Sequence, residues 1–172
     1  MPDLAARLAR VRVPIGFVAS AVALWLAHPT WGSIAVGGPI AVVGEVIRVW
    51  AAGHLEKGRE VTKSGPYRVT GHPLYLGSSI IGIGFAVATY SLWVVALAIV
   101  YLGGTLGAAI RSEEASLRAK FGREYVEYRQ GRTTDATRRF SLARAMRNRE
   151  YRAIVGLAAA LILLVLKAYL ML

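Results

Sequence analysis

The stretch "GPYRVTGHPLYLGSSIIGIG", residues 65–84, passes from a polar turn into an apolar helix without any spacer. Its first eleven residues hold an arginine, a histidine and two tyrosines, and the remainder is mostly apolar and dotted with glycines. Pro73 suits the first turn of a helix, because a helix needs no N–H at that position. Such an abrupt change is typical of a helix that enters a membrane from a polar surface.

The rest of the 172-residue chain repeats this alternation. Hydrophobic residues make up 55% of the chain, yet 21 Lys and Arg face 10 Asp and Glu. Near-continuous apolar blocks separated by basic segments are typical of polytopic membrane proteins. Five blocks approach the roughly 20 residues that a membrane-crossing helix needs; they lie at 13–27, 34–53, 73–90, 92–110 and 153–172. The sequence predicts an all-α membrane helix bundle of about five transmembrane helices, forming one domain over residues 1–172.

The charges of the connecting segments predict the orientation. Three arginines precede the first block, four Lys or Arg lie within 57–68, and twelve lie within 111–152. The other two connections, "HPTWGS" and "TYS", have no charged residue. By the positive-inside rule, we expect the N-terminus and every basic segment in the cytoplasm. The Ala- and Arg-rich usage suggests a bacterium, so the predicted location is the bacterial inner membrane.

Composition also excludes some chemistry and some partners. The chain has no cysteine, which excludes disulfides, thiolate metal sites and cysteine nucleophiles, and no metal site is predicted. The net charge of +11 predicts contact with anionic membrane lipids. No aromatic-basic binding module accompanies it, so a nucleic-acid partner is not expected.

Polar residues gather where helices meet the predicted cytoplasmic side. His72 lies at the mouth of the third block, where backbone N–H groups attract negative charge, and Tyr75 follows one turn later. The alternative is a capping histidine within an interfacial tyrosine belt. In the second block Glu45 and Arg48 are three residues apart, so they either neutralise each other or leave Arg48 to meet a ligand carboxylate.

The fourth block runs directly into "AIRSEEASLRAKFGREYVEYRQ", residues 109–130. Glu113 and Glu114 fill a gap in its apolar stripe at the membrane boundary. Glu114 has Arg118 at i+4, which predicts an ordinary helical ion pair. Glu113 has no basic residue at i+3 or i+4, so we expect it to face the bundle interior and to have a function. Arg123 lies beside the tyrosines that follow.

Glycines mark the helix faces in the third and fourth blocks. Gly77 and Gly84 are seven residues apart and share a face, whereas Gly82 lies off that face. Gly103 and Gly107 form a small-xxx-small pair. Close helix packing is the commoner use of glycine in membranes. The alternative is a groove in which a ligand lies against bare backbone.

Together these residues carry a family resemblance. "SGPYRVTGHPLYLGS" and, two blocks later, "EEASLRAKFGREYVEY" resemble the isoprenylcysteine carboxyl methyltransferase (ICMT) family and the related phospholipid N-methyltransferases. The resembling region spans about residues 48–129, and the last apolar block lies beyond it. Both families are integral-membrane enzymes that use S-adenosylmethionine.

The resemblance implies roles for particular residues. It implies that His72, Tyr75 and Leu76, followed by Gly82 and Gly84, form the first cofactor-binding segment. It also implies that Glu113 and Glu114 form the second segment. Relatives often carry an arginine before the His-Pro pair, where this chain has Gly71, so Arg68 or Arg111 is expected to substitute.

The predicted function is therefore S-adenosylmethionine-dependent methyl transfer to a lipid or prenylated acceptor. A carboxylate acceptor of the isoprenylcysteine type is favoured, with Glu113 as a catalytic residue and with Arg123 or Arg48 orienting the carboxylate. The alternatives are a phospholipid amine acceptor, a reductase of the sterol-reductase type that uses NADPH, or a non-catalytic membrane scaffold.

Overall fold

The structure, a computed structural model, describes residues 4–132 and 138–171, and side chains from residue 15 onward within those ranges. Every regular element within these residues is a helix, which confirms the all-α prediction. The helices are α1 (Leu4–Leu26), α2 (Trp31–His54), the 3₁₀ turn η1 (Gly65–Arg68), α3 (Pro73–Thr89), α4 (Leu92–Arg129), α5 (Leu142–Arg147) and α6 (Tyr151–Leu170).

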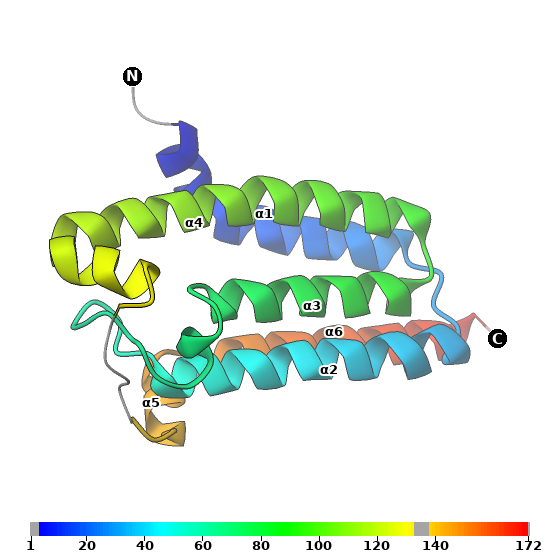
Figure 1. Cartoon of the computed structure of the whole chain (residues 1–172). Helices are drawn as coiled ribbons and strands as arrows, with labels where there is room; N and C mark the ends of the chain where they lie inside the picture. The colour runs from blue at the N-terminus through cyan, green and yellow to red at the C-terminus, as the bar shows by residue number, and fades with distance from the viewer. Residues whose placement is uncertain (1–3, 133–137, 172) are drawn as a thin grey trace.

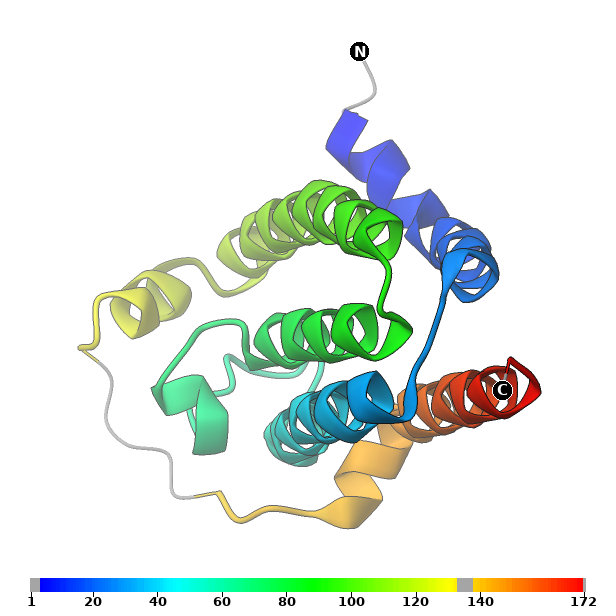
Figure 2. The same cartoon turned by 90° about the vertical axis from the view of Figure 1, so that its right-hand side faces the viewer.

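Five long helices lie side by side and form one elongated bundle (Figure 1). The view along their axes places α4 beside α1 and α3, and α6 beside α2 (Figure 2). Within the described residues, α2, α4 and α6 are long and apolar enough to cross a membrane. The apolar helices Ile15–Leu26 and Pro73–Thr89 are shorter. Three spans are therefore supported by length, and five spans with a cytoplasmic N-terminus stay a prediction.

The basic connecting segments and the charge-free connecting segments lie at opposite ends of the bundle. The basic segments after α2 and after α4 lie at one end, together with η1 and α5 (Figure 1). The two short charge-free connections lie at the other end, where the backbone N–H of His28 donates to the carbonyl of Thr89 across 2.8 Å. Thr30 caps α2 through Ser33, and the hydroxyl of Ser33 also donates to the carbonyl of Ala88. The segregation of charge that the positive-inside argument needs is thus present in the folded chain.

Four glycines bring α2 and α3 into close contact. Gly37 and Gly44 on α2 meet Gly84 and Gly77 on α3, because these two helices run antiparallel. A Cβ at Gly84 would collide with the backbone nitrogen of Ala41, and one at Gly44 would lie 2.7 Å from the carbonyl oxygen of Gly77. For Gly77 and Gly84 the structure therefore favours helix packing over a ligand groove, the two alternatives that the sequence left open. The other predicted pair, Gly103 and Gly107, has open space where a Cβ would stand.

The contacts of Lys167 explain why a basic residue lies within the last apolar block. Lys167, near the end of α6, donates to the carbonyls of Leu24 and Trp25 at 2.8 and 2.9 Å. These carbonyls belong to the last turn of α1, which has no intrahelical partners for them. Lys167 therefore caps α1 and joins the first apolar helix to the last one.

The orientation can be tested with cysteines, because the native chain has none. His28→Cys lies in a charge-free connection, and Arg59→Cys lies in the basic segment after α2; both native side chains are exposed. In right-side-out spheroplasts, we expect an impermeant thiol reagent to label position 28, and to label position 59 only after lysis. Labelling of position 59 without position 28 in sealed spheroplasts would reverse the predicted orientation.

Candidate active site

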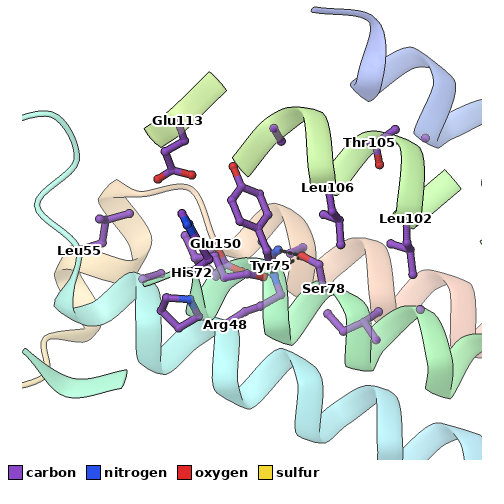
Figure 3. Close-up of a pocket in the computed structure, with 18 of the residues that line it drawn as sticks. Arg48, Leu55, His72, Tyr75, Ser78, Leu102, Thr105, Leu106, Glu113 and Glu150 are labelled. Carbon is purple, nitrogen blue, oxygen red and sulfur yellow. Dashed lines mark hydrogen bonds and ion pairs between the residues drawn. The ribbon is translucent and has the colours of Figure 1, made fainter. Parts of the chain in front are cut away.

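A cavity of about 1100 Å³ opens between α3 and α4 and is lined by residues of α1, α2 and α6 as well. Its lining changes character along the bundle. Polar side chains gather near the ends of the helices that carry the basic segments, as Figure 3 shows for Arg48, His72, Tyr75, Glu113 and Glu150. Farther along, the lining is apolar, with residues such as Phe85, Leu97, Leu102, Leu106 and Leu157. The cavity therefore joins a polar mouth to an apolar interior.

His72 begins α3 at this mouth, but its side chain does not cap the helix. Its Nε2 instead donates to Oε1 of Glu114 on α4 across 3.1 Å. The ring of His72 also lies against that of Tyr75, with 5.8 Å between the ring centres. The capping alternative is therefore wrong, and His72 and Tyr75 lie together in the cavity lining.

The two adjacent glutamates have different surroundings. Glu113 lines the cavity, and no ion pair or hydrogen bond joins it to the residues that the structure describes. Glu114 lies behind His72 and pairs with Arg129, whose Nη2 is 3.3 Å from Oε1. The same oxygen of Glu114 therefore has two partners, His72 and Arg129. The expected partner, Arg118, acts only at longer range, because the folded-back end of α4 supplies Arg129 instead.

The end of α4 folds back because the helix breaks at Gly122. Its backbone has φ 48° and ψ −118°, a conformation that glycine adopts without the strain of a Cβ. After the break, Tyr125 is buried, and the hydroxyl of Tyr128 donates to the carbonyl of Tyr67 across 2.6 Å. Burial raises the pKa of Tyr67 above its ordinary value. The last turns of α4 thus close over the mouth.

The same break brings Arg129 beside Gly71, the position for which the family resemblance implied an arginine. A Cβ built at Gly71 would lie 2.9 Å from Nη1 of Arg129. The guanidinium therefore occupies the space that a side chain at position 71 would enter. We had expected Arg68 or Arg111 to substitute for an arginine at position 71. Arg129 was not expected there, because the break at Gly122 was not predicted.

Arg48 lies deeper in the cavity and has three partners. Its Nε lies 2.7 Å from Oε1 of Glu150 and 3.7 Å from Oε2 of Glu45, and its Nη1 donates to the hydroxyl of Ser78 across 2.5 Å. The predicted pair with Glu45 exists, but Glu150, 102 residues away in sequence, is the closer partner. Glu150 was missed; the only signal for it was one acid at the end of a basic segment, just before an apolar block.

Glu150 is held in place by the segment that precedes it. The ring of Phe140 fills the space beside Gly53, where a Cβ would collide with it. Arg144 donates to the carbonyl of Gly53 across 2.6 Å, and the amide of Asn148 donates to the carbonyls of Ala52 and Leu55 at 2.8 and 2.9 Å. These bonds satisfy the free carbonyls at the end of α2. They also fix the start of α6, and therefore Glu150, beside Arg48.

Four of the predicted site residues lie outside the cavity lining: Glu114, which lies behind His72, and three others. Leu76 is 48% exposed on another face of α3, and Gly84 packs against α2. Arg123 is exposed and forms a helical ion pair with Glu127 across 2.8 Å. Gly82 does line the cavity, facing Leu102 of α4. Arg123 is thus not positioned to orient an acceptor held inside.

The structure is a bundle of helices, three of them long and apolar enough to cross a membrane, around a cavity whose polar mouth continues into a mostly apolar interior. Comparison with protein families matches residues 33–124, more than half of the chain, to the phospholipid methyltransferase family. The chain belongs to that family of membrane methyltransferases, in agreement with the resemblance seen in its motifs. Comparison with curated proteins and with solved structures gave no match. The matched region ends at residue 124, just after Gly122 and before Arg129, Glu150 and α6.

Proposed function

We propose that the protein transfers a methyl group from S-adenosylmethionine to a lipophilic acceptor at the cytoplasmic side of the bacterial inner membrane. The continuous cavity is the observation that carries this proposal, because it joins a polar mouth to an apolar interior. A donor dissolved in the cytosol and an acceptor held in the bilayer can meet in such a cavity. Family membership supports the same reaction class.

The residues at the mouth fit the donor. Its carboxylate needs a cation, and the guanidinium of Arg129 lies at Gly71 beside His72. Its amino group and positively charged sulfur need carboxylate or aromatic neighbours, which Glu113 and Tyr75 supply. We therefore propose that His72, Tyr75, Glu113 and Arg129 hold the donor.

Bound there, the donor would supply an electrophilic methyl group on sulfur. The protein's own contribution is mainly positioning. Glu114 fixes the ring of His72, and the last turns of α4 cover the mouth through the bond between Tyr128 and Tyr67. Holding two reactants in line can contribute several kcal/mol, roughly 7–11 in well-oriented systems. No arrangement of metal ligands is needed for this role.

Two acceptors remain under the proposed reaction. A carboxylate of the isoprenylcysteine type, favoured from the sequence, needs an arginine to orient it. Arg123 lies outside the cavity and Arg48 is already paired with Glu150. A phospholipid amine needs no arginine, and the description of the family supports it. The partner is in either case a lipid or a lipidated molecule that enters from the membrane.

The first experiment compares ligands on the purified protein. We expect S-adenosylmethionine to bind and to raise the melting temperature in detergent by several degrees, and NADPH at the same concentration to leave it unchanged. Stabilisation by NADPH alone would favour a reductase. Binding of neither ligand would favour a non-catalytic scaffold and would contradict the proposal.

The role of His72 gives a second measurement on the same preparation. His72→Ala removes the group that Glu114 positions at the mouth of α3. We expect S-adenosylmethionine to bind at least fivefold more weakly, while the melting temperature without ligand changes by less than about 3 °C, because one part-buried hydrogen bond contributes roughly 1 kcal/mol. Unchanged affinity in the folded variant would remove His72 from the binding site.

A further inference from the structure

Exposed arginines surround the junction between α5 and α6. Residues 138–152 contain six arginines and one acid, Glu150. Arg138 and Arg144 face the bundle and pair with acids of the segment after α2. Glu150 pairs with Arg48 in the cavity, so its charge does not offset the remaining arginines. Those remaining four are exposed: Arg139, Arg147, Arg149 and Arg152.

The three arginines nearest the junction have little counter-charge. Arg149 and Arg152 form no ion pair with the residues that the structure describes. Nη2 of Arg147 lies 3.7 Å from Oε1 of Glu56, but that oxygen is closer to Arg144, at 2.7 Å, and the side chain of Arg147 is 65% exposed. We call these three arginines, together with the exposed side chains of Leu142 and Tyr151, the junction patch.

The length of α6 sets the level of the junction patch in the membrane. At a rise of about 1.5 Å per residue, its 20 residues extend about 30 Å, which matches the thickness of the hydrocarbon layer. The first turn of α6 therefore lies among the lipid head groups when α6 crosses the bilayer. α5 lies there too, at the edge of the bundle beside the end of α2 (Figure 1 and Figure 2).

The apolar members of the junction patch suit this level. Leu142 is 58% exposed and Tyr151 is 45% exposed, although neither lies in the middle of a membrane-crossing helix. The guanidinium of Arg152 lies over the ring of Tyr151, 5.9 Å from its centre. Aromatic and apolar side chains beside arginines are typical of the boundary between head groups and acyl chains.

The backbone of Arg149 provides an independent observation. Its φ is 63°, in the left-handed region that favours glycine. It follows Asn148, the C-terminal cap of α5, at the position where helices most often end with glycine. An arginine there costs conformational energy that glycine would not. A function of the exposed, charged side chain explains why this strained position carries an arginine.

We propose that the junction patch binds the head-group phosphate of an anionic phospholipid in the cytoplasmic leaflet. Guanidinium groups hold phosphate oxygens through paired hydrogen bonds, and basic clusters directly before a membrane-crossing helix recognise anionic head groups. None of the five residues lines the cavity, and all lie beyond the matched residues 33–124. The patch is therefore separate from the proposed active site, and lipid binding there does not depend on the proposed reaction.

The test measures lipid binding to the purified full-length protein in detergent by native mass spectrometry. The probes are dioleoyl-phosphatidylglycerol, which is anionic, and dioleoyl-phosphatidylcholine, which has the same chains and no net charge. We expect the anionic lipid to bind at least fivefold more tightly. Inorganic phosphate in excess, at constant ionic strength, should not displace it. Equal binding of the two lipids, or displacement by phosphate, would overturn the proposal of a lipid site.

Two triple variants then separate the junction patch from the overall positive charge. Replacing Arg147, Arg149 and Arg152 by Gln should weaken binding of phosphatidylglycerol at least fivefold. The matched control replaces three exposed arginines of the other basic segments, Arg59, Arg123 and Arg132, by Gln, and it should change binding less than twofold. Equal losses in the two variants would show diffuse attraction to the net charge and would contradict a site at the junction.

Arg149→Gly distinguishes a binding role from a structural one. Glycine adopts the left-handed conformation freely, so we expect the melting temperature in detergent without added lipid to stay the same or to rise. Affinity for phosphatidylglycerol should fall at least twofold, because one of the three guanidinium groups is lost. A lower melting temperature with unchanged lipid affinity would show that Arg149 serves the fold and would remove it from the lipid site.

Discussion

Glu113→Gln is expected to lower methyl transfer at least tenfold, a loss of about 1.4 kcal/mol in transition-state stabilisation. Glu113 lines the cavity at its mouth, and no described residue forms an ion pair with it. Its negative charge is therefore available to a cationic ligand. Glutamine keeps the size and hydrogen-bonding capacity of the side chain and removes only that charge. The measurement is turnover of radiolabelled S-adenosylmethionine with an accepted lipid.

The neighbouring glutamate provides the comparison. Glu114→Gln should cost only a few-fold, because glutamine keeps an oxygen that accepts the hydrogen bond from His72. Glu127→Gln should leave turnover unchanged, since an exposed helical pair contributes roughly 0.3–0.5 kcal/mol. Full activity in Glu113→Gln would exclude the proposed role of its charge. A larger loss in Glu114→Gln would show that positioning His72 matters more than the charge of Glu113.

The second large effect concerns the fold. Gly84→Ala should destabilise the protein strongly, because its Cβ would collide with the backbone of Ala41 on α2, and a backbone cannot move aside as a side chain can. Overpacking costs typically 1–3 kcal/mol, so we expect a fall in melting temperature of about 5 °C or more in detergent.

Gly103→Ala is the matched control, because nothing lies within 4 Å of a Cβ at that position. Both changes replace a glycine inside a helix with alanine. This replacement by itself stabilises the helix by up to about 1 kcal/mol. Gly103→Ala should therefore leave the melting temperature unchanged or raise it slightly. Equal melting temperatures of the two variants would contradict the close α2–α3 packing.

Glu113 has no ion-pair partner among the described residues, as predicted, but it is exposed rather than buried. The helical pattern placed Glu113 near the interior, and we expected an unpartnered buried carboxylate there. In the structure Glu113 is exposed to the cavity, because α4 stands away from α3 at this level. The buried carboxylate oxygens without hydrogen bonds are those of Glu45, which the sequence had paired with Arg48, and Oε1 of Glu150.

Some features of the protein were determined by the sequence alone. The apolar blocks, the segregation of basic segments, the shared face of Gly77 and Gly84 and the motifs around His72 and Glu113 all depend on spacing within one helix or one segment. The period of a helix fixes such relations before any tertiary contact forms. These features were enough to predict the all-α class and membership of the methyltransferase family.

Only the tertiary structure decided which charges meet. Arg48 pairs with Glu150, and Arg129 reaches Gly71 and Glu114, across distances that sequence spacing does not encode. The first pairing depends on residues 138–150 folding back against the end of α2, and the second depends on the break at Gly122. An ion pair between helices needs both helices in a particular rotation and position, which the packing of the whole chain sets. The distribution of charge in the cavity therefore follows from the fold.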